Sequence, residues 1–318
     1  MSLNFTLKIP ASSANLGPGF DTLGLGLKLY LTIKGEFIKE EGADEVEFSF
    51  EGDGKELMSK DRKENLITKS MYCLLEKYGK SIINGRLKLH IKNSVPLGRG
   101  LGSSASAVVG GVMLGNEVSG LNLKESEILN VILDIETHPD NVIPCFKGGL
   151  ITSYVDQKAE NKVGYVKLPL NKNIRAILIV PDYPLETSKA RKALPESYTR
   201  EQVVFNLQRL TVLCSSLCQE ELNADLIYNS MKDKIHQPYR QHLIPGLEEC
   251  LKTLTPSSLP GLLGICLSGA GPTVLALASD NLDTIGNTIK KILDKEGKCD
   301  CKVMPLQVEP KGVEVIYN

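Results

Sequence analysis

Residues 95–106, which read Val-Pro-Leu-Gly-Arg-Gly-Leu-Gly-Ser-Ser-Ala-Ser, constrain the fold more than any other segment of the chain. The glycines Gly98, Gly100 and Gly102 stand at alternate positions, where they allow positive φ angles and a close approach of the backbone to a bulky group. Apolar residues then recur at helical spacing, so we expect a helix to begin near Ser103. The unpaired N–H groups and the partial positive charge at such a helix start attract anions.

We interpret this loop as a phosphate cradle, with an ordinary turn as the alternative. It is not a Walker A loop, because no Gly-Lys-Ser/Thr closes it, and it is not a Rossmann fingerprint, because its third glycine comes too early. A loop rich in Gly and Ser before a helix can also be a simple turn. The adjacent hydroxyls of Ser103 and Ser104 favour the phosphate interpretation, since a hydroxyl there can cap the helix or bind a Mg²⁺ that bridges phosphates.

The composition excludes several classes of protein. A chain of 318 residues is long enough for about two domains, each with its own core. Its 37 Lys and Arg against 38 Asp and Glu give a net charge of -1, without the basic excess that binding to a nucleic-acid backbone needs. Hydrophobic residues at 42% and charged residues at 24% are typical of soluble globular proteins.

The cysteines and the apolar stretches predict a cytoplasmic protein. The eight cysteines form no Cys-x-x-Cys pair and have no His at zinc-site spacing, so we expect reduced thiols. The first residues lack a basic segment followed by an apolar core, so no signal peptide is expected. The uncharged stretch 253–279 is interrupted by prolines and glycines, which favours two buried strands around a tight turn over a membrane span.

The hydrophobic periodicity predicts an α+β chain of two domains, with a boundary near residue 160. Segment 10–21 is expected to be an irregular Gly-rich loop. The capping-box pattern Asn122-x-x-Glu125 predicts the start of another helix. Strands are expected at 45–50, 86–91, 150–155, 174–180, 262–267, 273–278 and near 302 and 313, and helices at 65–78, from 103, from the capping box at 122–125 through 135, within 187–228 and at 282–293.

Three Gly-rich segments in a fixed order connect the chain to a family. They are Pro10 to Asp21, the loop 95–106, and Leu-Ser-Gly-Ala-Gly-Pro-Thr at 267–273. In this order and spacing they resemble the substrate loop, phosphate loop and C-terminal turn of the GHMP small-molecule kinases. Within that family the chain resembles the branch that phosphorylates homoserine, through the segments Glu-Thr-His-Pro-Asp-Asn-Val at 136–142, Thr-Ser-Lys-Ala-Arg at 187–191 and Arg-Gln-His-Leu-Ile-Pro-Gly at 240–246.

The resemblance runs nearly end to end and implies a fold. It implies an N-terminal ATP-binding domain over 1–160, with a left-handed β-α-β unit, and a C-terminal ferredoxin-like domain over 161–318. ATP and a small-molecule substrate would lie in the cleft between them. The family also suggests a homodimer.

The resemblance assigns the nucleotide and its metal to particular residues. Mg²⁺ would be held by Ser104 and Glu136. Arg99 replaces the small residue that many relatives carry, so its side chain either points into solvent or contacts the nucleotide. The residues implied to bind ATP are Asn65, Pro96, Leu97, Gly98, Arg99, Gly100, Leu101, Gly102, Ser103, Ser104, Ala105 and Ser106.

The resemblance also implies a binding site for L-homoserine. The carboxylate of this zwitterion suits the guanidinium groups of Arg191 and Arg240. Its ammonium group suits Asp21 and the side-chain carbonyl of Asn15, and His138 would orient the substrate by a hydrogen bond. The residues implied to bind substrate are Asn15, Asp21, His138, Thr187, Arg191, Arg240 and Gly269.

Asn141 stands where related kinases place an Asp that accepts the proton of the substrate hydroxyl. An amide cannot serve as a general base, although phosphoryl transfer depends mostly on positioning and charge neutralisation. We therefore expect the γ-phosphate itself to take the proton, with Asn141 placing the hydroxyl. The catalytic residues implied are Asn141, Asp140 and Glu136, of which Asp140 is the one that could act as a base instead.

Three alternatives are weighed against this interpretation. The chain could phosphorylate another small alcohol, or bind ATP and a metabolite as a sensor without catalysis. Arg191, Arg240 and the run 138–141 argue against the first, and the intact Ser104 and Glu136 argue against the second. A nucleic-acid-binding module is disfavoured by the neutral charge balance and by the lack of basic stretches interleaved with aromatic residues.

Overall fold

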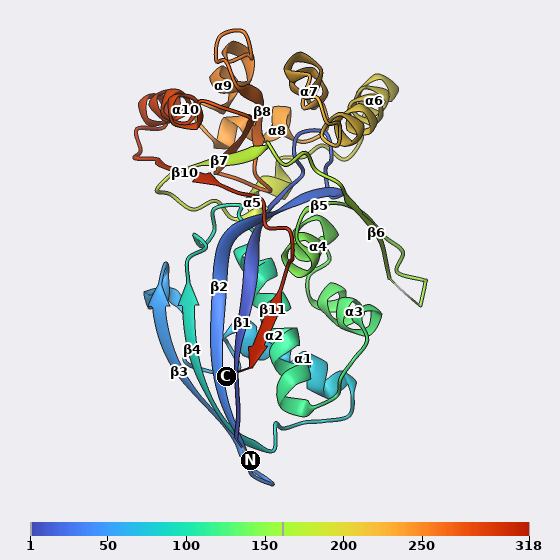
Figure 1. Ribbon diagram of the computed structural model, residues 1–318, viewed down its shortest axis with the longest axis vertical. Coiled ribbons are helices and arrows are strands. Elements are labelled where there is room, and N and C mark those ends of the chain that lie inside the picture. The colour runs from blue at the N-terminus through green and yellow to red at the C-terminus, as the bar shows by residue number, and fades with distance from the viewer. Residues whose placement is uncertain (1, 161, 318) are drawn as a thin grey trace.

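The computed structural model describes residues 2–160 and 162–317, which form two sheets with helices packed on them (Figure 1). The first sheet has the order β11-β1-β2-β4-β3, and β5 joins it by pairing with β2 and with β6. All of these pairings are antiparallel except that of β3 with β4, which are parallel. The strands are β1 (Ser2–Ala14), β2 (Leu23–Lys39), β3 (Asp44–Gly52), β4 (Gly85–Asn93), β5 (Leu150–Val155), β6 (Val163–Leu168) and β11 (Glu314–Tyr317).

Helices cover one face of the first sheet. Alternate residues of β1, namely Phe5, Leu7 and Ile9, are fully buried and share a hydrophobic core with the helices. The connection between the parallel strands β3 and β4 passes through α1. The helical elements of this half are η1 (Lys55–Leu57), α1 (Leu66–Lys77), α2 (Ser103–Ser119), α3 (Glu125–Ile135) and α4 (Pro139–Lys147).

The second sheet is antiparallel, with the order β10-β7-β9-β8. In chain order this is 4-1-3-2, the arrangement of a ferredoxin-like domain. Its strands are β7 (Arg175–Val180), β8 (Leu262–Leu267), β9 (Val274–Ala278) and β10 (Lys302–Leu306). Its helical elements are α5 (Thr187–Lys192), α6 (Arg200–Ser216), α7 (Ala224–Ser230), α8 (Gln237–Arg240), η2 (Gln241–Leu243), α9 (Leu247–Thr253) and α10 (Leu282–Gly297).

Both faces of β7 are buried, which explains its continuous apolar sequence. Ile177 and Ile179 belong to a core with residues of α9 and α10. Ala176 and Leu178 belong to another core, which includes residues of α6 and α7 and the ends of β1 and β2. The second sheet is therefore packed directly against the first half of the molecule.

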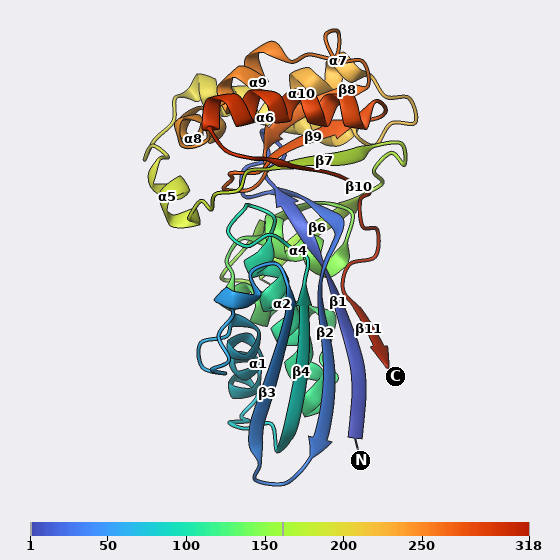
Figure 2. The same cartoon turned by 90° about the vertical axis from the view of Figure 1, so that its left-hand side faces the viewer.

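The chain returns to the first sheet at its end. Figure 2 shows β11 beside β1 and away from β10, the strand that precedes it in the chain. The register pairs Phe5 of β1 with Tyr317 of β11. β6 also belongs to the first sheet, although it follows residue 160. The division into domains at residues 160 and 161 and the handedness of the β3-α1-β4 connection stay predictions.

The predicted elements at 86–91, 103 onward, 150–155, 262–267 and 273–278 are confirmed as β4, α2, β5, β8 and β9. Segment 10–14 was expected in a loop, which is wrong: β1 continues to Ala14, because its backbone pairs with β2 beyond a register shift after Pro10. β6 had not been expected.

The predicted capping box of α3 is also wrong. Asn122 adopts a φ of 51° and donates to the Gly120 carbonyl, so it does not cap the helix. Instead the N–H of Lys124 donates to the Glu127 carboxylate at 2.8 Å. This pair lies two residues further along the chain than the predicted pair Asn122 and Glu125. The helix therefore begins at Glu125, later than a cap at Asn122 would place it.

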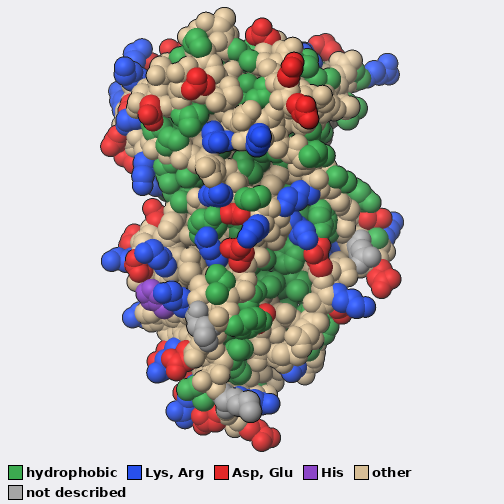
Figure 3. All heavy atoms as spheres, viewed as in Figure 1, with side chains coloured by type: hydrophobic (Ala, Val, Ile, Leu, Met, Phe, Trp, Pro, Cys, Tyr) green, Lys and Arg blue, Asp and Glu red, His purple; other side chains and the backbone are tan. Residues whose placement is uncertain are grey.

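The surface carries both charge signs. On the face shown in Figure 3, Lys and Arg are interspersed with Asp and Glu, in keeping with the net charge of -1. Over residues 2–160 and 162–317, no helix combines the length and the apolar character that crossing a membrane requires.

Candidate active site

A cavity of about 150 Å³ gathers most of the predicted site residues from six separate segments. These segments are the loop after β1, the Gly-rich loop before α2, the start of α4, the segment that leads into α5, the end of α8, and the turn between β8 and β9. The predicted residues that line it are Asn15, Asp21, Gly98, Arg99, Gly100, Leu101, Gly102, Ser103, Ser104, Ala105, Glu136, His138, Asp140, Asn141, Thr187, Arg191, Arg240 and Gly269.

The Gly-rich loop has the backbone that the sequence predicts. Gly98, Gly100 and Gly102 have φ angles of 66°, 74° and 67°. Gly102 is the N-cap of α2, and no side chain in the part of the chain that the structure describes caps the helix, which leaves its first N–H groups for a ligand. The loop is held from the second half of the molecule, because Ser268 Oγ donates to the Gly100 carbonyl at 2.7 Å.

Arg99 lines the first cavity and is also held by the protein itself. Its guanidinium donates to three carbonyls, those of Leu97 (3.1 Å), Pro181 (3.0 Å) and Asp182 (2.8 Å). Two of these acceptors lie directly after β7. Arg99 therefore ties the Gly-rich loop to the second sheet, a role that the sequence did not suggest.

Arg99→Ala is expected to lower stability more than ATP binding. Removing three hydrogen bonds from a charged donor should cost about 1–3 kcal/mol of unfolding free energy, because the carbonyls lose partners. The KM for ATP should stay within about threefold of the parent value. Thermal unfolding and steady-state kinetics measure the two effects, and a large rise in the KM for ATP at unchanged stability would instead assign Arg99 to the nucleotide.

A second cavity of about 390 Å³ adjoins the first, with which it shares Gly98, Ser103 and Ser104. Its other walls are mainly apolar and suit a flat nucleobase. Asn65 lines it while capping α1: its Oδ1 accepts from the Ile67 N–H and its Nδ2 donates to the Ser59 carbonyl, both at 3.0 Å. The lining residues are Leu31, Leu57, Met58, Ser59, Glu64, Asn65, Leu66, Ile67, Asn93, Leu97, Gly98, Ser103, Ser104 and Ala107.

Two predicted nucleotide residues line neither cavity. Ser106 is buried one turn into α2, where its hydroxyl donates to the Ser103 carbonyl at 3.0 Å. Pro96 precedes the loop and is also absent from both walls. The predicted run 96–106 therefore reaches the cavities only through its central residues.

Arg240 presents a buried positive charge to the first cavity. Its side chain is 2% exposed, and burial, with the nearby Arg191, lowers its pKa. Nε donates to the Ala190 carbonyl at 3.1 Å, and Nη1 donates to the Gly269 carbonyl at 3.3 Å. Within residues 2–160 and 162–317, Nη2 has no hydrogen-bond partner and no carboxylate forms an ion pair with Arg240. A buried guanidinium of this kind calls for an anionic ligand.

Arg191 and Asp21 form a bidentate ion pair on the same wall. The two N–H···O distances are 2.8 and 3.2 Å. Asn15 supports this loop, because its Oδ1 accepts from the Asp21 N–H at 3.0 Å and its Nδ2 donates to the Gly269 carbonyl at 2.9 Å. The predicted acceptors for an ammonium group are thus already engaged within the protein, and a ligand would have to share or replace these contacts.

Glu136 and His138 form a second pair at the cavity. His138 Nδ1 lies 2.6 Å from Glu136 Oε1, and this hydrogen bond raises the pKa of His138. The bond occupies Nδ1, which leaves Nε2 of His138 available to a ligand.

Asp140 is the most perturbed carboxyl at the cavity. It is 1% exposed, its Oδ1 has no hydrogen-bond partner among the described residues, and burial together with Asp21 raises its pKa to about 7. The next residue, Asn141, receives a long hydrogen bond of 3.5 Å from Ser12 Oγ.

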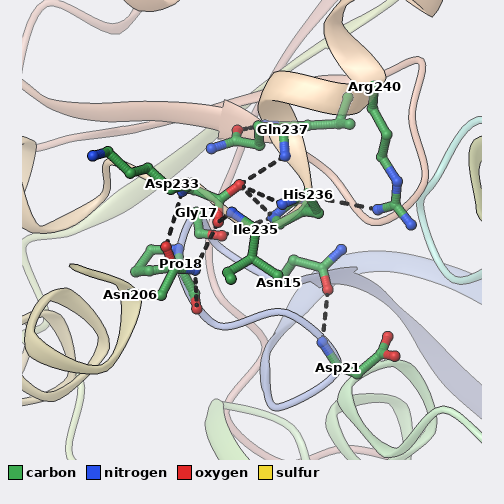
Figure 4. A network of polar contacts seen from close by, with 12 residues as sticks. Asn15, Gly17, Pro18, Asp21, Asn206, Asp233, Ile235, His236, Gln237 and Arg240 are labelled. Atoms are coloured by element: carbon green, nitrogen blue, oxygen red, sulfur yellow. Dashed lines mark hydrogen bonds and ion pairs between the residues drawn. The ribbon is translucent and has the colours of Figure 1, made fainter. Parts of the chain in front are cut away.

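Further residues, which the sequence did not single out, also shape the site. The Phe20 ring lies 5.6 Å from the guanidinium carbon of Arg191 and 5.2 Å from that of Arg240, within cation–π range of both. Leu185 and Ala270 also line the cavity. His236 contacts Arg240 from behind (Figure 4), and its position four residues before Arg240 is the one signal that could have pointed to it.

The site thus combines a Gly-rich loop suited to anions, an apolar second cavity beside it, and a small first cavity, or chamber, whose walls carry both positive and negative side chains. The chamber suits a small zwitterion with a carboxylate at Arg240. The end of this zwitterion opposite its carboxylate would face the Gly-rich loop. This arrangement favours transfer of a phosphoryl group between two bound molecules.

Comparisons with known proteins agree with this chemistry. A family model for the N-terminal domain of GHMP kinases matches residues 65–149. The homoserine kinase of Schizosaccharomyces pombe is 42% identical over 98% of this chain and 99% of its own, and that of Candida albicans is 41% identical over 98% of each. A crystal structure of homoserine kinase from Cytophaga hutchinsonii superposes with a TM-score of 0.82 at 28% identity, covering 99% of this chain and 97% of that one.

Proposed function

This chain belongs to the homoserine kinases of the GHMP kinase family, and we propose that its two adjoining cavities bind ATP and L-homoserine side by side. The enzyme transfers the terminal phosphoryl group of ATP to the hydroxyl of L-homoserine and forms O-phospho-L-homoserine, a reaction of threonine biosynthesis. In the proposal, the adenine base occupies the apolar pocket beside Asn65, and the phosphates lie along the Gly-rich loop at the start of α2.

The observation that carries the substrate assignment is the buried charge of Arg240. Its free Nη2 and the absence of a carboxylate partner among the described residues leave a place for the carboxylate of homoserine. Mevalonate also carries a carboxylate, but it has no ammonium group to use Asp21. The alternative substrates and the sensor hypothesis are not favoured, because the chain is similar to homoserine kinases over nearly its whole length.

The ion pair between Asp21 and Arg191 suits a zwitterion. When homoserine enters, its carboxylate can share Arg191 with Asp21 while its ammonium group binds Asp21. One internal ion pair is then replaced by a network of alternating charges, so no charge is left buried without a partner. Asn15, His138, Thr187 and Gly269 complete the proposed substrate pocket.

Ser104 and Glu136 fit the proposed Mg²⁺ site. Both line the same cavity, and they supply a hydroxyl and a carboxylate, the hard oxygen ligands that Mg²⁺ prefers. Oε1 of Glu136 binds His138, which leaves Oε2 for the ion. When bound, Mg²⁺ neutralises charge on the phosphates.

We propose that no side chain acts as a dedicated general base. Asn141 positions the substrate hydroxyl, and its proton passes to the γ-phosphate of ATP. Asp140, with its pKa near 7 and its side chain buried, stays mainly protonated below neutral pH, and its Oδ1, which has no partner among the described residues, is available to a ligand.

Asp140→Asn tests the mechanism without a base. A catalytic base contributes roughly 10²–10⁴-fold, so its removal would lower kcat by that factor. We expect kcat to fall by less than about tenfold, because in the proposed mechanism the proton passes to the γ-phosphate and the amide keeps the size of the carboxyl group. Rapid-quench and steady-state kinetics at pH 8 measure this, and a loss of several orders of magnitude at unchanged KM would establish Asp140 as the base.

The same variant should change stability with pH. The pKa of Asp140 rises from its ordinary value of 3.8 to about 7 in the fold, so the folded state holds the proton more tightly. The buried charge therefore destabilises the protein progressively between about pH 4 and pH 7. Asp140→Asn should melt at a higher temperature than the parent at pH 8, and the difference should shrink as the pH falls toward 4.

The reaction itself is tested by measuring ADP release with MgATP and a panel of acceptors. We expect saturable turnover with L-homoserine and none with mevalonate, galactose or no acceptor. Turnover with a different alcohol would retain the kinase and remove the substrate assignment. ATP binding without any turnover would support the sensor hypothesis instead.

We also propose an oligomeric state and a cellular location for the enzyme. A cytoplasmic homodimer is what the family resemblance suggests. Sedimentation velocity at micromolar concentration tests the homodimer, and a single monomeric species would remove it from the proposal.

A further inference from the structure

A buried polar network lies directly behind Arg240 (Figure 4). Asp233 is at its centre, with a fully buried side chain. Its carboxylate accepts hydrogen bonds from three backbone N–H groups, those of Ile235 (2.8 Å), His236 (3.0 Å) and Gln237 (2.7 Å). Asn206 Nδ2 donates a fourth bond at 2.7 Å. These four donors occupy Asp233, so it fixes the chain that enters α8 instead of pairing with Arg240.

His236 links this network to both sides of the substrate pocket. Its side chain is fully buried, and Nε2 lies 2.7 Å from the Gly17 carbonyl. Nδ1 lies 3.4 Å from Arg240 Nη1. A carbonyl only accepts and a guanidinium only donates, so Nε2 carries the proton and Nδ1 accepts from Arg240.

The imidazole also contacts the loop that bears Asp21. The Phe20 ring stacks on His236, with centroids 5.3 Å apart and an angle of 22° between the planes. The Gly17 carbonyl and the Phe20 ring are therefore both located by His236, while Arg240 is held by its other nitrogen. One side chain thus sets the distance between the proposed ammonium-binding loop and the proposed carboxylate-binding guanidinium.

We propose that His236 is a positioning residue for substrate recognition, which holds the Arg240 guanidinium toward the carboxylate of homoserine and ties it to the loop Gly17–Asp21. This inference rests on the proposed function and adds a residue that does not itself touch the substrate. At this wall of the pocket, Arg240 supplies the positive charge and His236 orients the guanidinium that carries it.

A neutral imidazole suits this task better than other side chains. A carboxylate in the same place would neutralise Arg240 and compete with the carboxylate of the substrate, whereas a second cation would repel the guanidinium. Nδ1 faces a guanidinium donor and therefore carries no proton, so the ring is neutral although the Asp233 carboxylate lies 3.6 Å from Nε2. Burial lowers the pKa of His236 in the same sense. Arg240 is therefore oriented while its charge remains available to a ligand.

Two substitutions separate the contacts of His236. In His236→Asn the amide oxygen can take the place of Nδ1 and accept from Arg240, but the side chain is too short to reach Gly17. In His236→Gln the amide nitrogen can take the place of Nε2 and donate to Gly17, but no acceptor faces Arg240. The pair therefore tests the Arg240 contact with matched amide side chains.

We expect His236→Gln to raise the KM for L-homoserine by about tenfold or more, with kcat and the KM for ATP within about threefold of the parent values. His236→Asn should restore the KM for homoserine to within about threefold. With 3-amino-1-propanol, which lacks the carboxylate, the two variants and the parent should have the same kcat/KM. Equal effects of both variants on homoserine, or an unchanged KM in His236→Gln, would overturn the proposal.

A measurement on the unmodified protein covers the case in which a variant fails to fold. Nitrogen NMR of the labelled imidazole should show His236 protonated at Nε2 only, and a ring protonated at Nδ1 would overturn the proposal. Calorimetric titration of homoserine into the parent keeps the two proposals apart. Absence of binding and turnover in the parent would refute the proposed function, whereas normal parent activity with unaffected variants would refute only the role of His236.

Discussion

Replacing Arg240 by Leu is expected to raise the KM for L-homoserine by roughly 10²–10³-fold, the cost of removing one partner from a buried charge pair. The kcat for the residual reaction should change much less, because Arg240 lies at the carboxylate end of the proposed pocket and not at the transferred phosphoryl group. The KM for ATP should stay close to that of the parent.

The substitution should not unfold the protein. It removes a buried charge that has no carboxylate partner among the described residues, which offsets the loss of the hydrogen bonds to Ala190, Gly269 and His236. Homoserine should raise the melting temperature of the parent and not that of the variant. Arg86→Leu is the matched control, since Arg86 is exposed and pairs with Glu40 far from the cavity.

An unchanged KM for homoserine in Arg240→Leu would place the substrate carboxylate elsewhere. Arg191 would then be the remaining candidate on the same wall, and Arg191→Leu would have to show the large effect instead. A proportional fall in kcat at constant KM would also contradict the assignment, because it would mean that Arg240 acts on the transition state alone.

Gly100→Ala is expected to damage the Gly-rich loop. A Cβ atom at Gly100 would lie 2.3 Å from the Ser268 carbonyl oxygen and 2.9 Å from the backbone nitrogen of Gly271. Its φ of 74° adds strain of about 1–2 kcal/mol for a residue with a side chain. The loop must move away from the β8–β9 turn, and a displacement of about 1 Å can cost roughly 10²-fold in rate.

Gly98→Ala provides the control for the backbone strain. Gly98 has a similar φ of 66°, but a Cβ atom there would meet only the Pro184 side chain, at 3.3 Å. Both variants should lose comparable stability from the unfavourable φ, and only Gly100→Ala should lose about 10²-fold in kcat/KM for ATP. Thermal unfolding and initial rates separate the two effects. Equal losses of activity would mean that strain, and not the clash with Ser268, disables the loop.

Much of the fold could be predicted from the sequence because its signals are local. Three alternating glycines predicted positive φ angles, which the structure confirms, and the apolar periodicity after Ser103 predicted α2. The paired segments 262–267 and 273–278 predicted two buried strands. Local patterns failed where pairing with a distant strand decided the outcome, as at Pro10 to Ala14.

In the candidate site, too, some features could be read from the sequence and others depended on the fold. The residue types of the site can be read from the sequence: the Gly-rich loop, Arg191 and Arg240, Asp21, and the family to which they point. Their contacts follow from the way the chain folds. Asp21 pairs with Arg191 across 170 positions of the chain, and Arg99 binds carbonyls 82 and 83 positions away. Arg240 is buried and left without a carboxylate partner among the described residues, while His236 and Asp233 hold the wall behind it. These outcomes depend on which charges are desolvated together and which donors meet which acceptors, and residue order alone cannot specify them.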